Sequence, residues 1–101
     1  MINEVSSRRA EIEELCRRYG VWRLDVFGSA AVGDFRPGES DLDFLVEFDS
    51  KGERYADRYF GLLEGLKELF EREVDLVEDS AIRNPYFRKS VDESRELLYA
   101  A

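Results

Sequence analysis

Two carboxylates, Asp41 and Asp43, stand two positions apart in a segment where polar and apolar residues alternate. Residues spaced in this way on a β-strand emerge on the same face of the sheet, so the two carboxylates are expected to lie close together. Their mutual repulsion is costly unless a cation lies between them. Mg²⁺ suits such a pair, because it prefers oxygen ligands and completes its shell with water and substrate phosphates.

Asp75 and the dipeptide Gly28-Ser29 extend this pattern. Asp75 lies in a later alternating segment, on the face opposite to that of its apolar neighbours. A third carboxylate at that place could share a second metal or accept the proton of an attacking hydroxyl. Gly28 ends a short strand, where backbone can approach a ligand closely, and Ser29 begins a short helix whose free N–H groups attract anions. Together these residues predict a site for metal and a polyphosphate.

Each feature is common when it occurs alone. An Asp-x-Asp sequence on a strand is usually a solvated edge, a Gly-Ser sequence is usually a turn, and a single Asp on a strand is usually just exposed. Their joint order is much less common: strand, Gly-Ser, short helix, Ser-Asp-x-Asp on an alternating strand, and then another strand that carries Asp. The combination therefore favours phosphoryl chemistry, which needs mainly positioning and charge compensation.

The composition narrows the chemistry further. The 101-residue chain contains no histidine, which excludes Ser-His-Asp chemistry, Cys-His chemistry and ordinary zinc sites. The net charge of −8 opposes direct binding to nucleic acid. Cys16 is the only cysteine and fits the apolar stripe of a helix, so it is expected in the core and in no internal disulfide. The length predicts one domain, residues 1–101, and the absence of a signal peptide or membrane span predicts a cytoplasmic protein.

The elements that must position these residues follow from the spacing of apolar side chains. Helical spacing covers about residues 3–19, 53–70 and a last helix that starts at Asn84-Pro85 and carries Phe87, Val91, Ser94 and Leu98 on one side. Strand patterns cover residues 22–27, 41–48 and 73–77, and a helical turn followed by a loop covers 29–40. On the longest helix, Gly61 and Gly65 predict close backbone packing. The alternation indicates an α+β (α/β) fold.

The chain resembles the DNA polymerase β-type nucleotidyltransferase superfamily in a paired motif, Phe27-Gly28-Ser29-Ala30-Ala31 through Ser40-Asp41-Leu42-Asp43-Phe44-Leu45-Val46. It is most similar to the minimal nucleotidyltransferase (MNT) proteins, the antitoxin partners of HEPN ribonuclease toxins in bacteria and archaea. The resemblance extends to Val74-Asp75-Leu76-Val77, to the helix between the motifs and to the chain length. It implies the polymerase β-like nucleotidyltransferase fold, a small mixed sheet of three or four strands flanked by helices.

The resemblance also implies roles for individual residues. Nucleotide binding falls to Gly28, Ser29 and Ser40, and Mg²⁺ binding and catalysis fall to Asp41, Asp43 and Asp75. Two features depart from the family pattern. Eleven residues separate Ser29 from Asp41 where ten are usual, and Val32 stands where these proteins often have arginine. The first change falls in a loop, which tolerates insertion, whereas the second removes a phosphate contact.

The resemblance implies an antitoxin enzyme that transfers AMP from ATP to a hydroxyl, expected to be a tyrosine, of a cognate HEPN toxin. One alternative is an antitoxin without catalysis that blocks its toxin by contact, with acidic surface covering a basic ribonuclease site. Another is a small-molecule nucleotidyltransferase that acts on an antibiotic or metabolite. The expected partners are ATP, Mg²⁺ and the toxin, in a homo- or hetero-oligomer, with no membrane and no direct contact to nucleic acid.

Overall fold

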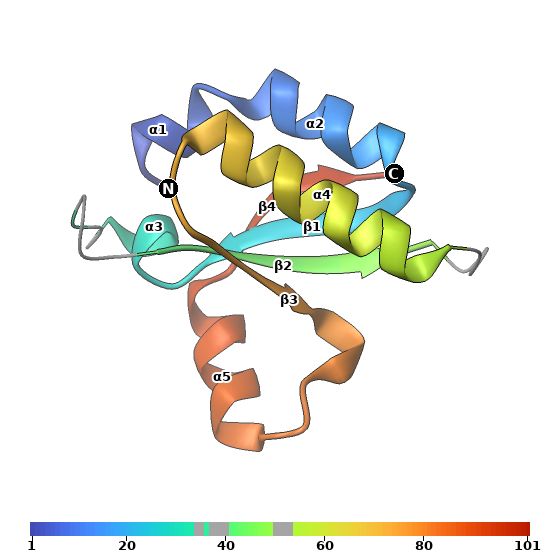
Figure 1. The fold of residues 1–101 in the computed structure, drawn as a ribbon. Coiled ribbons are helices and arrows are strands. Elements are labelled where there is room, and N and C mark those ends of the chain that lie inside the picture. Colours follow the sequence, from blue (N-terminus) through green and yellow to red (C-terminus); the bar gives the residue numbers. More distant parts are fainter. Residues whose placement is uncertain (34–35, 37–40, 50–53) are drawn as a thin grey trace.

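A computed structural model describes residues 1–33, 36, 41–49 and 54–101 of the chain. It contains a four-stranded sheet with the strand order β3-β2-β1-β4, flanked by helices (Figure 1). The elements follow in the order α1 (Asn3–Ser6), α2 (Arg9–Arg18), β1 (Val21–Phe27), α3 (Ser29–Val32), β2 (Leu42–Phe48), α4 (Tyr55–Phe70), β3 (Val74–Glu78), a 3₁₀ turn (Asp79–Ala81), α5 (Pro85–Ser94) and β4 (Glu96–Ala100).

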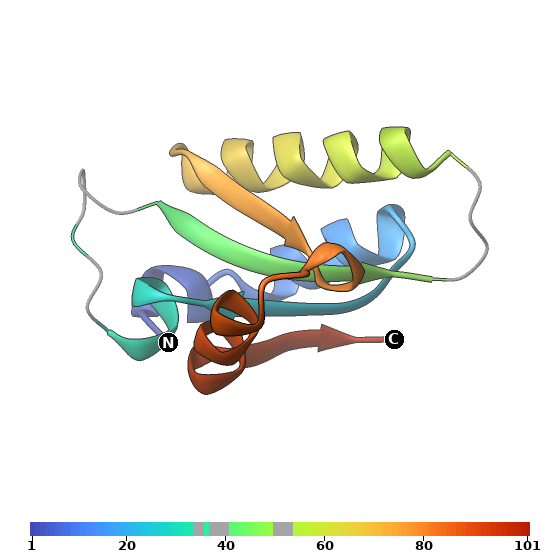
Figure 2. The same ribbon diagram turned by 90° about the horizontal axis from the view of Figure 1, so that it is seen from below.

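The sheet is mixed. Strand β1 pairs in antiparallel fashion with β2 on one side and with β4 on the other, while β2 and β3 run parallel. The helix α4 makes the crossover that a parallel pair requires. Helices α1, α2 and α4 lie on one face of the sheet and α5 lies on the other (Figures 1 and 2). The prediction of a small mixed sheet flanked by helices is confirmed.

Two apolar clusters hold these layers together. The main core lies between the sheet and helices α1, α2 and α4, and Cys16 is fully buried in it, as predicted. A smaller cluster on the opposite face joins Phe27, Leu45 and Val91, and so fastens α5 to β1 and β2. Strand β2 contributes side chains to both clusters, because successive side chains of a strand point to opposite faces. The face that carries α5 is also the face of Asp43, two residues before Leu45 on the same strand.

Helices α2 and α4 pack closely at two glycines. A Cβ placed on Gly61 would lie 2.3 Å from Cε1 of Tyr19, and one on Gly65 would lie 2.6 Å from Cδ2 of Leu15. Both distances are far below van der Waals contact, so the side chains of Tyr19 and Leu15 pack against the backbone of α4 where a larger residue would displace them. The predicted role of Gly61 and Gly65 in backbone packing is confirmed.

The single helix predicted for residues 3–19 is wrong in one respect. The structure has two helices there, because Ser7 and Arg8 interrupt the pattern, with Arg8 at φ −107° and ψ 17°. Ser6 and Ser7 donate hydrogen bonds from their hydroxyls to the carbonyls of Asn3 and Glu4, both at 3.4 Å. Such local side-chain bonds offer the backbone an alternative to helix, which explains the break.

The predicted extension of the last helix to Leu98 is also wrong. Helix α5 begins as predicted, with the Asn84 side chain accepting from two backbone amides, but it ends at Ser94. Arg95 adopts an extended conformation (φ −62°, ψ 138°), and β4 follows beside β1. Leu98 is buried in the main core from this strand. Val91 and Leu98 are seven residues apart, which suits two turns of helix, so helical spacing alone could not reveal the change.

The loop predicted around Pro37-Gly38, with its additional residue, lies outside the described residues, as does most of the turn predicted at residues 49–52. In the part of the chain that the structure describes, no helix has the length and apolar character to cross a membrane.

Candidate active site

The turn at Gly28 joins the end of β1 to α3 and lies against the side chain of Asp43. Gly28 has φ +72° and ψ −150°, a backbone conformation that residues other than glycine rarely adopt. A Cβ at this position would lie 2.6 Å from Oδ2 of Asp43. Glycine is therefore needed here both for the backbone conformation and for the close approach to the carboxylate.

Two backbone amides that follow Gly28 have no acceptor among the described residues. The hydrogen bonds of α3 begin with the amide of Ala31, which donates to the carbonyl of Gly28 at 3.1 Å. Over residues 1–33, 36, 41–49 and 54–101, no acceptor is found for the amides of Ser29 and Ala30. Unpaired N–H groups in such a turn can bind an anion, which is what the sequence predicts for Ser29.

Asp43 and Asp75 are brought together by the parallel pairing of β2 and β3. The two residues are direct partners in the register, so their side chains emerge side by side on one face of the sheet. Asp75 is exposed and Asp43 is partly buried. Burial, as the largest cause, and the negative charges of Asp75 and Asp41 together raise the pKa of Asp43 to about 6. Asp43 therefore sits in a place where negative charge is crowded.

Asp41 and Ser40 are placed less completely. Asp41 is exposed and directly precedes β2, and its charge reaches Asp43, two residues later. Ser40 lies outside the described residues. Among the residues that are described, no three acidic or cysteine side chains are gathered closely enough to hold a metal ion. The structure thus joins Asp43 to Asp75 but does not gather the three predicted carboxylates around one point.

The donor set nonetheless fits a divalent cation. In the described segments, no lysine or arginine forms an ion pair with Asp41, Asp43 or Asp75. Carboxylates that crowd one another without a cationic side chain are stabilised by a bound cation, and carboxylate oxygens are the ligands that Mg²⁺ prefers. The pKa of Asp43 is raised first by burial and then by the charges of Asp75 and Asp41, and a cation bound at Asp43 would offset both effects.

Two contacts at the end of α5 complete the site and were not predicted. The amide of Gly28 donates a hydrogen bond to Oγ of Ser94 at 2.9 Å. Asp25 on β1 is fully buried and pairs with Arg95, and with Nε of Arg23 at 3.0 Å. A charged residue such as Asp25 in an otherwise apolar strand is expected to pair with an opposite charge, but the sequence does not show that this charge belongs to Arg95. Ser94 carried no signal beyond its place on the buried side of the last helix.

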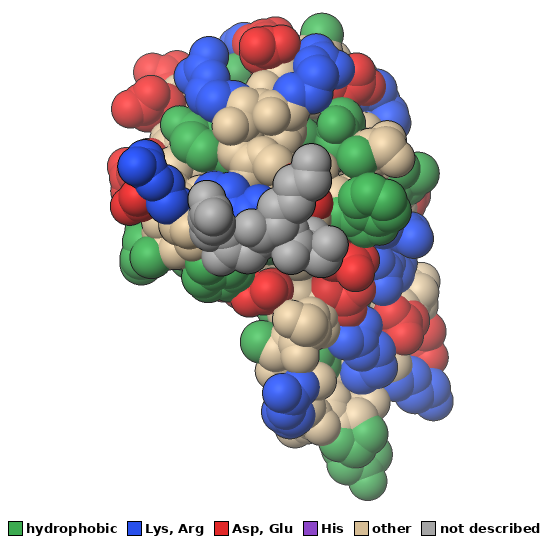
Figure 3. Space-filling view, turned by 90° about the vertical axis from the view of Figure 1, so that its right-hand side faces the viewer, with side chains coloured by type: hydrophobic (Ala, Val, Ile, Leu, Met, Phe, Trp, Pro, Cys, Tyr) green, Lys and Arg blue, Asp and Glu red, His purple; other side chains and the backbone are tan. Residues whose placement is uncertain are grey.

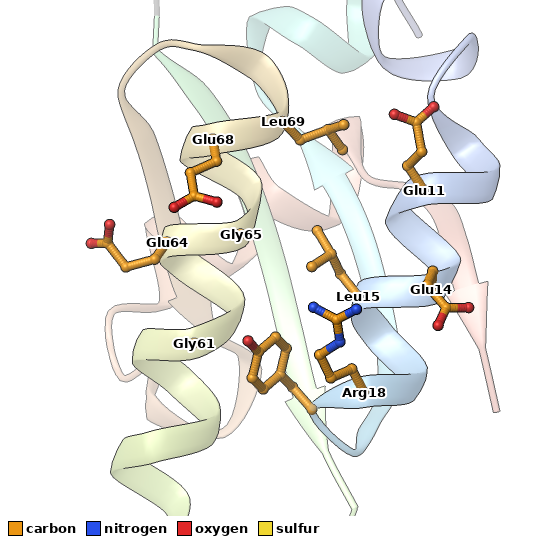
Figure 4. A pocket seen from close by; sticks show the side chains of 10 residues that line it. Glu11, Glu14, Leu15, Arg18, Gly61, Glu64, Gly65, Glu68 and Leu69 are labelled. Carbon is orange, nitrogen blue, oxygen red and sulfur yellow. The ribbon is translucent and has the colours of Figure 1, made fainter.

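A pocket of about 490 Å³ lies on the other side of the sheet, between α2 and α4 (Figure 4). Leu15, Tyr19 and Leu69 line it together with Gly61 and Gly65, and charged side chains, mostly glutamates, surround them. The pocket is the gap left by the close crossing of the two helices. It is separated by the sheet from Asp43 and Asp75, so it is not the place where their chemistry would occur.

Figure 3 shows the end of the molecule where α4 begins, with α5 and the preceding segment forming a lobe below the body. Lysine and arginine side chains are mixed with aspartate and glutamate over this face. Tyr86, at the start of α5, is 83% exposed. The described residues on this face form no continuous basic surface of the kind that binds a nucleic-acid backbone.

Comparison with known proteins gives a family for the chain. Residues 9–98 match the family model described as a nucleotidyltransferase domain. A protein of Methanocaldococcus jannaschii, provisionally named a protein adenylyltransferase, is 36% identical over 98 residues, which cover 89% of this chain and 95% of that protein. Both matches span the Gly28 turn and the three aspartates.

Solved structures share the fold. A protein provisionally named a minimal nucleotidyltransferase is 34% identical, with a TM-score of 0.76 over 91% of this chain and 90% of that one. A chain from a complex described as a tri-AMPylated Shewanella oneidensis HEPN toxin with its MNT antitoxin has a TM-score of 0.65, with 17% identity over 95% of this chain and 72% of the other. The latter similarity concerns the fold alone.

Proposed function

From the finding that this chain belongs to the nucleotidyltransferase domain family, we propose that it is a Mg²⁺-dependent adenylyltransferase, which moves AMP from ATP to a hydroxyl of a partner protein. The family establishes the transfer of a nucleotide. The choice of ATP, of Mg²⁺ and of a protein acceptor is the proposal. The related M. jannaschii protein, named for adenylyl transfer to protein, supports this choice.

The observation that carries the proposal is the register of Asp43 with Asp75, beside the Gly28 turn. The amides of Ser29 and Ala30 would bind oxygens of the triphosphate. Asp41 and Asp43 would hold Mg²⁺, which when bound compensates the charge of the phosphates and of the leaving pyrophosphate. The Gly28 turn and the carboxylates would thus enclose the phosphates from two sides.

Asp75 is the carboxylate best placed to receive a proton. It is exposed, so an acceptor hydroxyl can reach it, and it lies next to Asp43, where the phosphates would be held. The hydroxyl oxygen forms a bond to the α-phosphorus of ATP while the bond from that phosphorus to pyrophosphate breaks, and the hydroxyl proton passes to Asp75. The positioned groups would do the rest, because phosphoryl transfer depends mainly on orientation and electrostatic stabilisation.

For the acceptor we propose a tyrosine of a cognate HEPN toxin, in the cytoplasm where ATP is supplied. The complex of a tri-AMPylated HEPN toxin with an MNT antitoxin, whose fold this chain shares, supports a toxin as the acceptor. The acidic net charge of −8 also suits a basic protein partner better than a nucleic acid.

Transfer of label from [α-³²P]ATP tests the proposal. The protein is incubated with labelled ATP, MgCl₂ and the HEPN toxin proposed as its partner. We expect label on the toxin with the wild type, none without Mg²⁺, and a loss of at least about 100-fold with Asp43→Asn or Asp75→Asn, because both remove charge where it is needed.

Glu47→Gln is the matched control, because Glu47 is an exposed carboxylate on the same strand as Asp43. This variant is expected to retain transfer. If the wild type transfers no label, or if Asp43→Asn transfers as much as Glu47→Gln, the mechanism is wrong. Neutralisation of the toxin without ATP would favour the antitoxin that acts by contact alone.

A further inference from the structure

The last turn of α5 reaches the Gly28 turn through one hydroxyl. Oγ of Ser94 accepts the hydrogen bond from the amide of Gly28 at 2.9 Å. The same oxygen lies 3.3 Å from the carbonyl of Ser90 and 3.4 Å from that of Val91, so its own proton is donated back to the helix. A hydroxyl whose proton is used in this way presents its lone pairs outward, and the Gly28 amide uses one of them.

The residues on both sides of Ser94 hold this hydroxyl in place. Three positions before it, Val91 is buried against Phe27 and Leu45, directly beneath the end of β1. Immediately after it, Arg95 forms an ion pair with Asp25, which is fully buried. The hydroxyl is therefore carried by a segment that two contacts hold against the sheet.

The orientation of the Gly28 amide determines the directions in which the following backbone amides of the turn point. Gly28 adopts a conformation open to glycine (φ +72°, ψ −150°), and glycine has many other conformations within reach. A rotation of the peptide between Phe27 and Gly28 would break the bond to Ser94. It would also move the neighbouring amides and the contact of Gly28 with Asp43, which is close enough to exclude a Cβ.

We propose that Ser94 is a positioning residue of the nucleotide site: it fixes the Gly28 amide and thereby aims the amides of Ser29 and Ala30 at the triphosphate. The inference rests on the proposed function, since it assigns Ser94 to the site where ATP would bind. Ser94 touches neither the reacting atoms nor the metal. Its effect passes through the backbone of the turn, and so it belongs to the binding of nucleotide and not to the chemical step.

The test compares Ser94→Ala with Ser94→Thr, which keeps a hydroxyl, and with Ser90→Ala. Ser90 lies one turn earlier on the same helix, is exposed, and contributes only its carbonyl to the contact. Titration calorimetry with a non-hydrolysable ATP analogue and MgCl₂ gives the Kd of each protein. Hydrogen exchange followed by NMR gives the protection of the Gly28 amide in the same proteins without nucleotide.

We expect Ser94→Ala to raise the Kd for the analogue about three- to tenfold, the effect of losing one hydrogen bond, and to speed exchange of the Gly28 amide by a similar factor. Ser94→Thr should restore both quantities, and Ser90→Ala should leave both near the wild-type values. A Ser94→Ala protein with the wild-type Kd overturns the proposal even if it melts at a lower temperature, because a merely structural serine would change the melting temperature alone.

The two proposals fail in different ways. If the wild type binds no ATP analogue, the proposed function is wrong, and with it any role of Ser94 toward nucleotide. If the wild type binds but exchange at Gly28 is unchanged in Ser94→Ala, the hydrogen bond does not hold the turn and only the role of Ser94 is wrong. A change in exchange without any change in Kd also overturns it, since Ser94 would then hold the Gly28 amide without any effect on the binding of nucleotide.

Discussion

The side chain of Asp43 is adjacent to the other two parts of the candidate site, Asp75 and the Gly28 turn. Its strand pairs it with Asp75, the Gly28 turn closes over its carboxylate, and its pKa is raised to about 6 by burial and by the charges of Asp75 and Asp41. The position was predictable from the alternation of Asp41 to Phe48. The contact with Gly28 was not, because it depends on how β1 and β2 pair, and one strand does not determine its register with another.

Replacing Asp43 with asparagine should stabilise the protein in the absence of metal. The folded protein takes up a proton on Asp43 near pH 6, whereas the unfolded chain does so near 3.8. The stabilisation that protonation gives is therefore complete below about pH 4 and is lost as the pH rises through 6. Near pH 7.5 we expect Asp43→Asn to gain about 1 kcal/mol, since solvent screening at this half-buried site removes much of the effect of the shift.

Urea unfolding at a series of pH values measures this gain, with Glu47→Gln as the control of equal charge change on the same strand. The advantage of Asp43→Asn should disappear near pH 4. A variant that is less stable than the wild type near pH 7.5 would show that Asp43 is not held in a repulsive environment.

Gly28→Ala should impair nucleotide binding more than Gly33→Ala does. Both glycines have positive φ, +72° and +90°, so both alanine variants carry backbone strain of about 1–3 kcal/mol. Only at Gly28 would the new Cβ meet a neighbour, Oδ2 of Asp43 at 2.6 Å, whereas at Gly33 nothing described lies within 4 Å. We expect Gly28→Ala to weaken binding of an ATP analogue more than about tenfold.

Calorimetric titration of both variants separates strain from contact. Gly33→Ala reports the effect of a positive φ in the left-handed region without a close contact, and it should bind the analogue with nearly wild-type affinity. Equal losses in the two variants would mean that the close approach to Asp43 is of no consequence for the nucleotide.

The helices and strands with a clear periodicity of apolar residues were predicted. Strand β4, which depends on its pairing with another strand, was not. Strands β1 to β3 and helix α4 follow from alternation and from a helical stripe. Strand β4 was missed because Val91 and Leu98 are spaced as on a helix, while the strand exists through its pairing with β1. The same error hid the contact of Ser94 with Gly28, since a helix extended to Leu98 would not end at the Gly28 turn.

Leu98→Ala tests β4 directly. Leu98 is 2% exposed and packs in the main core, while its neighbour Leu97 is 46% exposed. If residues 96–100 form a strand, Leu98→Ala should reduce the free energy of unfolding by about 2–4 kcal/mol and Leu97→Ala by about 0.5 kcal/mol. Urea unfolding of the two variants measures the difference, and comparable losses would argue against the alternation of a strand.

The molecule as a whole is a sheet with a thick helical layer on one face and a single helix, α5, on the other (Figure 1). The thick layer carries most of the core, whereas the other face leaves the sheet accessible beside α5, where Asp43 and Asp75 emerge. Stability and chemistry are therefore placed on opposite faces. This division was implied by the two faces of β2 in the sequence, although the element that covers the second face was not foreseen.

The thiol of Cys16 reports on the integrity of the helical layer. Cys16 is fully buried in the main core, and burial, with the charge of Glu13, raises its pKa to about 12. Since the thiolate is the reactive form, the native protein should react with DTNB at neutral pH at least about 100-fold more slowly than the protein in urea. Fast reaction of the native protein would mean that α2 leaves the sheet readily.

The measurement that tests the central claim most directly is the mass of a co-expressed toxin. The protein and the HEPN toxin proposed as its partner are produced together, once with the wild type and once with Asp43→Asn, and the intact toxin is weighed by mass spectrometry. The account predicts a toxin mass raised by one or more AMP groups with the wild type and an unmodified toxin with Asp43→Asn. An unmodified toxin in both samples, or equal modification in both, would contradict it.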